Sequence, residues 1–189
     1  MGASAVSRDL SESLSFQVAA VCYRRKGYRL EFLLVRTDKG RWSFPKGHLE
    51  RELTSSQAAA REALEEAGAI GVIARRPFAR YRHHKRTLSA EVTVRAYLLR
   101  VVHTVETPET HRRPTWFPPR KARNKLVSSC KAKYRKELRS VLDQAIRLLD
   151  RENSGRHIPK PRVLAFHLPC CNAEGCSPCS PRPRPDKSI

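Results

Sequence analysis

The chain has 189 residues, enough for one domain with a hydrophobic core and extensions at its ends. Its 38 Lys and Arg residues outnumber 18 Asp and Glu residues, which gives a formal net charge of +20. No segment approaches the ~20 apolar residues of a membrane-spanning helix, and residues 1–15 lack the apolar core of a secretory signal. The sequence therefore predicts a cytoplasmic protein with no membrane partner.

A positive charge of this size attracts polyanions such as nucleotides, polyphosphates and RNA. The charge does not choose among these partners, and it is equally compatible with nonspecific nucleic-acid binding. It predicts an anionic nucleotide or polyphosphate as the partner and leaves RNA open. The oligomeric state stays unpredicted.

The first elements in chain order are two strands that form a hairpin. The apolar run Phe16–Tyr23 predicts a buried strand, and the basic segment Arg24–Gly27 predicts the turn into a second strand, Leu30–Val35. Asp38–Gly40 predicts another turn. The chain then enters the segment 41–50, with the sequence RWSFPKGHLE, just before a helix.

That helix is predicted from Ser55 to Ala67. Thr54 and Gln57 have the spacing of a capping box, and Gly68 is a typical residue just past a helix end. Apolar residues recur at i, i+3, i+4 and i+7, which predicts one buried face: Ala60, Ala63, Leu64 and Ala67.

Three carboxylates share another face of this helix. Glu62, Glu65 and Glu66 lie at i, i+3 and i+4, where like charges repel unless something neutralises them. Magnesium binds carboxylate oxygens and shares its site with substrate phosphates, so the cluster indicates phosphate chemistry. The alternative is a solvated acidic face with Arg51 and Arg61 as ordinary surface partners.

The passage from Gly47 to Gly68 resembles the box of the Nudix hydrolase (MutT-like) family. That pattern is a glycine, a loop, Arg-Glu, an aliphatic residue, any residue, Glu-Glu, any residue and glycine. Gly47, Arg61-Glu62, Glu65-Glu66 and Gly68 match it with the family's spacing. The preceding segment, Trp-Ser-Phe-Pro-Lys-Gly, is similar to the sequence at this place in two branches of the family, the dinucleoside polyphosphate hydrolases and the diphosphoinositol polyphosphate branch.

One position departs from the pattern, because Leu53 stands where the family has a glutamate. In the family this glutamate mostly sets the loop and its arginine partner rather than binding metal. The resemblance therefore implies an intact metal site. The ordering of Arg61, and with it the activity, depends on whether a neighbouring carboxylate, Glu50 or Glu52, replaces the missing one.

The resemblance also implies a set of site residues. Mg²⁺ or Mn²⁺ would be held by Glu62, Glu65, Glu66 and the backbone carbonyl of Gly47. Glu65 is the expected catalytic base and Arg61 would orient the glutamates. Other candidates for the base are Glu91, Glu106 and Glu109.

Basic residues near the box are candidates for binding substrate phosphates. Lys46 directly precedes Gly47, and Arg82 and His83 belong to a predicted basic loop, residues 81–86. The alternative for each is a solvated basic side chain.

Further along, the sequence predicts four more strands and two helices. The strands are Gly71–Ala74, Pro77–Arg82, Ala90–Val102 and Thr115–Phe117; the helices are Arg120–Leu126 and Cys130–Asp150. With the resemblance, this order predicts an α/β fold, a Nudix-type α/β/α sandwich with a mixed β-sheet. The domain would span residues 14–150.

Residues 151–189 are expected to form a poorly ordered basic tail rich in proline and cysteine. The tail contains four clustered cysteines: Cys170, Cys171, Cys176 and Cys179. They are interpreted either as a zinc site or as an unstructured, redox-labile cluster.

Together these features predict a metal-dependent hydrolase of a nucleoside-diphosphate-linked or polyphosphate substrate, with a dinucleoside polyphosphate as the expected one. The alternatives are a nucleoside triphosphate or RNA 5′-end pyrophosphohydrolase, and a catalytically weak Nudix-fold protein that binds nucleotide or RNA.

Overall fold

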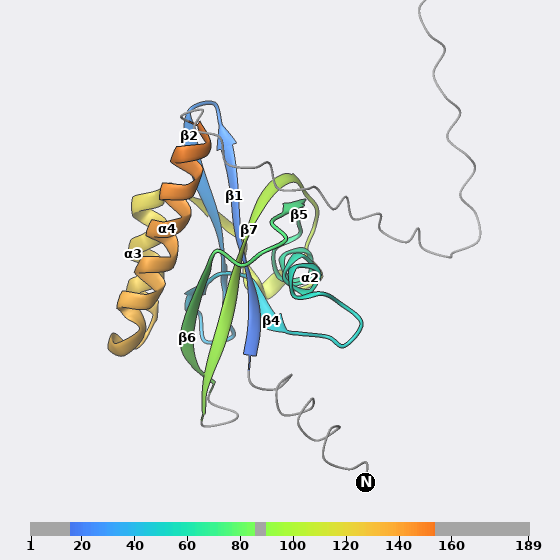
Figure 1. The fold of residues 1–189 in the computed structure, drawn as a ribbon, viewed down its shortest axis with the longest axis vertical. Helices are drawn as coiled ribbons and strands as arrows, with labels where there is room; N and C mark the ends of the chain where they lie inside the picture. Colours follow the sequence, from blue (N-terminus) through green and yellow to red (C-terminus); the bar gives the residue numbers. More distant parts are fainter. Residues whose placement is uncertain (1–15, 86–89, 154–189) are drawn as a thin grey trace, which may run out of the picture.

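The computed structural model describes residues 16–85 and 90–153, which form a mixed sheet between two layers of helices (Figure 1). The strands are β1 (Phe16–Lys26), β2 (Arg29–Arg36), β3 (Trp42–Ser43), β4 (Lys46–His48), β5 (Ala69–Ile73), β6 (Ala79–Lys85), β7 (Ala90–Thr104) and β8 (Thr115–Phe117). The helices are α2 (Ser55–Ala67), α3 (Pro119–Ser129) and α4 (Arg135–Asn153), with short 3₁₀ helices η2 (Thr110–Arg112) and η3 (Ala132–Tyr134).

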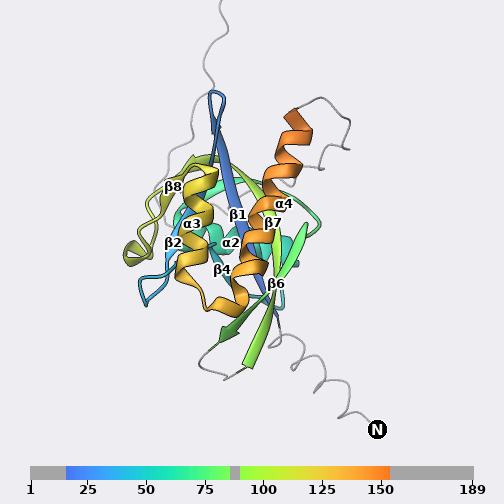
Figure 2. The same cartoon turned by 90° about the vertical axis from the view of Figure 1, so that its left-hand side faces the viewer.

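The sheet runs in the order β3-β2-β1-β7-β5, while β4 pairs with β1, β6 with β7 and β8 with β2. The β1–β7 pair is parallel and the other pairs are antiparallel. Helix α2 covers one face, and α3 and α4 cover the other (Figures 1 and 2). The predicted α/β/α sandwich with a mixed sheet is confirmed.

Strand β1 lies at the centre because both of its faces are apolar. Val18, Ala20 and Cys22 pack into the core beneath α2, whereas Ala19 and Val21 pack into the core beneath α3 and α4. A strand covered on both faces reads as a continuous apolar run, which is the pattern that predicted it. The run ends well before β1 does, however.

The predicted turn at Arg24–Gly27 is wrong at its start. The ladder continues to the pair Lys26–Arg29, so only Gly27 and Tyr28 connect β1 to β2. Arg24 forms a 2.8 Å ion pair with Glu31 across the ladder. Cross-strand pairs of opposite charge let basic residues extend an exposed strand.

The predicted basic loop at residues 81–86 is also wrong, because residues 81–85 belong to β6. Every residue of β6 pairs with a residue of β7. The earlier prediction of a strand ending at Arg82 was therefore too short. Charge alone indicated a loop, but the backbone of this segment finds its partners in the long neighbouring strand.

The C-terminal helices differ from prediction at their boundaries. Helix α3 starts at Pro119, where proline's missing N–H costs nothing, and continues to Ser129. The predicted helix from Cys130 starts only at Arg135, because Cys130 and Lys131 are extended and η3 intervenes. Helix α4 runs to Asn153, past the expected boundary at Asp150. The rest of the predicted tail, residues 154–189 with its four cysteines, lies outside the described residues.

None of the helices in the described part of the chain is long and apolar enough to cross a membrane.

Candidate active site

Helix α2 carries the acidic residues of the box, and local contacts define both of its ends. The predicted capping box is present: the Gln57 N–H donates to Thr54 Oγ1 at 3.3 Å, and the Thr54 N–H donates to Gln57 Oε1 at 2.9 Å. At the other end, Gly68 has φ +59° and its N–H donates to the Leu64 carbonyl at 2.8 Å. The predicted bounds of this helix are confirmed.

The buried face of α2 is rotated slightly from the predicted stripe. Ala59, Ala63 and Ala67 are fully or almost fully buried, whereas Leu64 is half-buried. This rotation brings Glu66 to the edge of the core, where it is only 5% exposed. A carboxylate at such a position requires compensating partners.

Glu66 finds those partners on two sides. Its Oε2 accepts the Lys46 backbone N–H at 3.0 Å, and its Oε1 lies 3.1 Å from Arg112 Nη2. Burial raises the pKa of Glu66, and the nearby charges of Lys46 and Arg112 oppose this rise. For Lys46 burial lowers the pKa, opposed chiefly by Glu66. The predicted phosphate-binding Lys46 therefore lies within electrostatic reach of the carboxylates.

Glu62 lies directly against Gly47 of β4. A Cβ placed on Gly47 would be 1.7 Å from Glu62 Oε1, so a side chain at this position would force the Glu62 carboxylate to move. Burial raises the pKa of Glu62 to about 7, and repulsion from Glu66 and Glu65 adds to the effect. The fold thus crowds two carboxylates, Glu62 and Glu66, around the glycine backbone.

Glu65 is turned toward Arg61 instead. Arg61 Nε lies 2.7 Å from Glu65 Oε1, and Arg61 Nη1 lies 2.6 Å from Glu50 Oε2. Leu53 packs against the core beneath α2. Arg61 is therefore paired with two carboxylates, Glu65 on the same helix and Glu50 from the preceding loop, although position 53 is a leucine.

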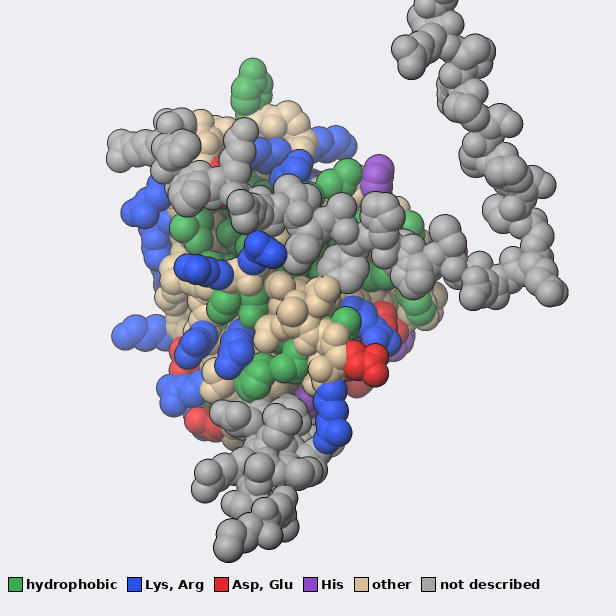
Figure 3. All heavy atoms as spheres, turned by 45° about the vertical axis from the view of Figure 1, so that its right-hand side comes forward, with side chains coloured by type: hydrophobic (Ala, Val, Ile, Leu, Met, Phe, Trp, Pro, Cys, Tyr) green, Lys and Arg blue, Asp and Glu red, His purple; other side chains and the backbone are tan. Residues whose placement is uncertain are grey.

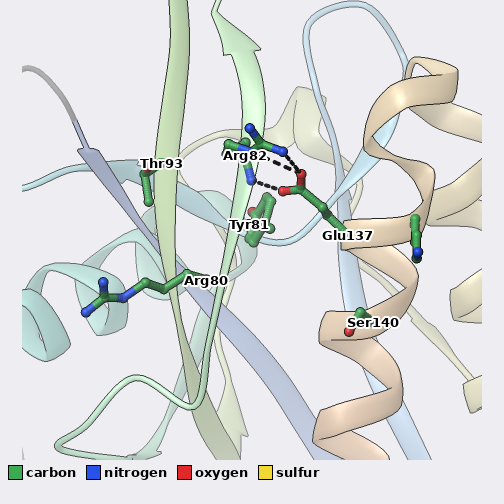
Figure 4. Close-up of a pocket in the computed structure, with 7 residues that line it drawn as sticks. Arg80, Tyr81, Arg82, Thr93, Glu137 and Ser140 are labelled. Atoms are coloured by element: carbon green, nitrogen blue, oxygen red, sulfur yellow. Dashed lines mark hydrogen bonds and ion pairs between the residues drawn. The ribbon is translucent and has the colours of Figure 1, made fainter.

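The predicted substrate residues of β6 lie elsewhere. Arg82 forms a two-point contact with Glu137 of α4, at 3.0 and 2.7 Å, and lines a cavity of about 470 Å³ between β6 and α4 (Figure 4). Because α4 and α2 cover opposite faces of the sheet, the structure does not bring Arg82 together with the α2 carboxylates. His83 pairs with Val92 in the sheet, and its side chain lies outside the described part.

Of the downstream acidic candidates, the structure brings Glu109 to the site. Its charge raises the pKa of both Glu62 and Glu66. Glu91 instead accepts hydrogen bonds from Lys133 Nζ at 2.7 Å and from the Tyr134 hydroxyl at 3.0 Å, near the start of α4.

Two residues at the site were missed by the sequence analysis. Arg112 contacts Glu66 from the segment after β7, and no sequence pattern marks it because the contact is purely tertiary. Tyr81 is 3% exposed, and its hydroxyl is the one buried side-chain polar atom without a hydrogen-bond partner among residues 16–85 and 90–153. Burial raises the pKa of Tyr81, and the charge of Glu66 adds to this rise.

The donor set fits a hard cation in an open site. Within the described ranges, no three His, Cys, Asp or Glu side chains form a ready-made metal group. Glu62 and Glu66 nevertheless supply two crowded carboxylates beside a glycine backbone, and burial together with repulsion from Glu66 raises the pKa of Glu62. Magnesium typically takes one or two carboxylates and completes its shell with water and substrate phosphates.

Comparisons with known proteins agree with this geometry. The family model described as the NUDIX domain matches residues 15–138, so the chain belongs to the Nudix hydrolase family. No curated protein matches the chain significantly.

Solved structures with this fold include a C. elegans Ap4A hydrolase binary complex, at 22% identity and a TM-score of 0.60, covering 72% of this chain and 98% of that one. Another is the NUDIX domain of Shewanella oneidensis NrtR complexed with ADP ribose, at 17% identity and a TM-score of 0.53. The match covers 71% of this chain and 87% of that one. A mutT/nudix family protein from Listeria innocua matches at 17% identity and a TM-score of 0.54, covering 74% of this chain and 96% of that one.

Replacing Gly47 with alanine is expected to displace the Glu62 carboxylate and to weaken binding of Mn²⁺ by about 10–100-fold, the usual effect of misplacing a metal-site ligand. The atom in the way is the end of a flexible side chain, so the thermal midpoint should change little. Isothermal titration calorimetry measures the affinity. In a Glu62→Ala background the same substitution should add almost nothing; a full additional loss there would show that it does not act through Glu62.

Proposed function

We propose that the protein is a metal-dependent hydrolase that cleaves a phosphoanhydride bond in a nucleoside-diphosphate-linked or polyphosphate substrate, with a dinucleoside polyphosphate as the expected class. The observation that carries the proposal is the pair of crowded carboxylates, Glu62 and Glu66, against Gly47 within a matched Nudix box. The similarity in fold to the C. elegans Ap4A hydrolase supports the substrate class.

In this proposal Glu62 and Glu66 hold Mg²⁺ or Mn²⁺ together with the Gly47 carbonyl. A bound divalent cation would lower the pKa of a water molecule that it binds, and it would neutralise the negative charge that develops on the phosphates. Glu65 is the proposed base, held in place by Arg61 and available because its side chain is 40% exposed. Glu109 is the alternative base that the structure brings close.

Positive charge outside the carboxylate site favours an anionic substrate. Lys46 borders Glu66 and is proposed to contact a substrate phosphate. Lys and Arg side chains are spread widely over the face shown in Figure 3, where acidic side chains are few. Such a field raises the local concentration of polyanions. Arg82 and His83 remain proposed contacts for a distant part of the substrate.

A catalytically weak protein that binds nucleotide or RNA is the second candidate. Two observations favour it: the Glu65 carboxylate faces Arg61, and no ready-made group of three metal-binding side chains exists in the described residues. A nucleoside triphosphate or RNA 5′-end pyrophosphohydrolase would use the same carboxylates on a different substrate.

The deciding experiment is phosphate release with Mg²⁺ or Mn²⁺ across a panel of diadenosine polyphosphates, nucleoside triphosphates, nucleotide sugars, inositol pyrophosphates and triphosphorylated RNA. Glu65→Gln is measured beside the parent, with Glu52→Gln as a control because Glu52 is an exposed carboxylate in the loop of the same box. Metal-dependent cleavage of diadenosine polyphosphates that only Glu65→Gln loses supports the proposal. Retention of RNA or nucleotide without any turnover supports the binding protein.

A further inference from the structure

Arg112 forms the centre of a charge cluster that joins three separate segments. Its Nη2 lies 3.1 Å from Glu66 Oε1 of α2, its Nε 2.5 Å from Glu109 Oε2 and its Nη1 3.6 Å from Asp38 Oδ1 in the turn between β2 and β3. The arginine side chain is only 17% exposed. A guanidinium with its rigid fork of donors suits such a multiple contact.

The cluster holds more negative than positive charge. Glu66 is nearly buried, and Arg112 is its one side-chain ion-pair partner within the described part of the chain. A buried carboxylate without a partner is strongly unfavourable. In the protein without a divalent ion, the positive charges of Lys46 and Arg112 offset the charge of Glu66, and Arg112 is the one in direct side-chain contact with it.

The backbone beside Arg112 adopts a conformation that is unusual for a residue with a side chain. Arg113 has φ +46°, and it is the one residue other than glycine with positive φ in the described ranges. Side chains with a Cβ rarely adopt this conformation. Arg113 itself has no ion-pair partner there, so the Arg112 contacts, together with the backbone bonds of η2, keep the segment in place.

We propose that Arg112 is a resident counter-ion of Glu66 that a divalent cation must displace. This inference rests on the proposed function, which assigns Glu66 to the metal. A dication and a guanidinium at the same carboxylate repel each other, so the ion pair of Arg112 with Glu66 is lost or weakened as the metal binds. The same event loosens the link between Glu66 and Glu109, which couples occupancy of the metal site to the segment that carries Glu109.

The test is the affinity for Mn²⁺ alone, measured by calorimetry on the full chain without substrate. Arg112→Gln is expected to bind Mn²⁺ about tenfold more tightly than the parent, the factor that corresponds to one charge-assisted contact. Arg113→Gln is the matched control, because it removes the same charge one residue further along without touching Glu66. Its affinity should stay within about twofold of the parent.

Thermal unfolding gives a second readout. Arg112→Gln should lower the midpoint in the presence of a chelator, and saturating Mn²⁺ should remove most of the difference, because a ligand stabilises the state that it binds. If Arg112→Gln does not fold, Arg112→Lys, which keeps the charge but loses the fork, is expected to gain about threefold in affinity.

Unchanged or weaker Mn²⁺ binding by the Arg112 variants, or an equal gain for Arg113→Gln, would overturn the inference. A parent protein that binds no Mn²⁺ would instead refute the proposed function and this inference with it. The two failures are therefore distinguishable.

Discussion

Replacing Glu66 with glutamine is expected to lower kcat/KM for metal-dependent phosphoanhydride hydrolysis by roughly 10²–10³-fold, a typical loss for removing one group that stabilises charge in the transition state. The amide keeps the size of the side chain and its ability to accept the Lys46 N–H, which contacts Oε2 at 3.0 Å. It removes the negative charge that the cation requires.

The measurement is steady-state hydrolysis of the best substrate from the panel at several Mg²⁺ concentrations. If the loss arises from the metal, a higher Mg²⁺ concentration should recover part of it. Glu52→Gln should leave the rate unchanged, since Glu52 is exposed. A Glu66→Gln enzyme with parental kcat/KM would remove Glu66 from the metal site.

Replacing Gly68 with alanine is expected to reduce the free energy of unfolding by about 2–5 kcal/mol, from left-handed strain together with forced overpacking. Gly68 has φ +59°, and a Cβ there would lie 2.0 Å from the Val105 carbonyl oxygen. That oxygen belongs to backbone that also donates a hydrogen bond to the Gly68 carbonyl at 2.8 Å, so it cannot move away without breaking the contact.

Gly27 supplies a control with the same backbone conformation. Its φ is +61°, and a Cβ there would meet no atom within 4 Å. Gly27→Ala should therefore cost only the left-handed strain, about 1–2 kcal/mol. Urea unfolding of the two variants separates strain from collision. Equal losses would mean that the contact with Val105 relaxes freely.

Gly68 also connects stability to the site. Residues 105–107 lie against the end of α2 and form two hydrogen bonds with it. The Val105 N–H donates to the Gly68 carbonyl at 2.8 Å, and the Thr107 hydroxyl donates to the Glu65 carbonyl at 2.5 Å. This attachment carries the chain toward Glu109 and Arg112. A defect at the helix end is therefore expected to disturb the acidic site as well as the fold.

Local sequence signals predicted the elements whose causes are local. Helix α2 was predicted with its correct bounds because Thr54, Gln57 and Gly68 terminate it through contacts within one or two turns. The central strand was predicted from its apolar run, although its end was not. The motif predicts Gly47, Glu62, Glu65 and Glu66 as one site; Glu62 lies against Gly47, whereas Glu65 faces Arg61. The family match confirms the class of enzyme.

Only the tertiary structure decided which partner each charged side chain has. Sequence spacing left open whether Glu50 or Glu52 would accompany Arg61, and the loop before α2 presents Glu50. Arg82 was assigned to substrate from its position in a basic run, but the pairing of β6 with β7 places it against Glu137 of α4.

Arg112 shows the same limit most clearly. It lies 46 positions after Glu66 in the sequence, and no periodicity relates the two residues. They meet because β7 crosses the sheet and the next segment folds back over the end of α2. The sequence by itself determined the acidic helix and the chemistry of its carboxylates. The tertiary structure determined which cations neutralise them, because an ion pair depends on distance in space and carries no pattern along the chain.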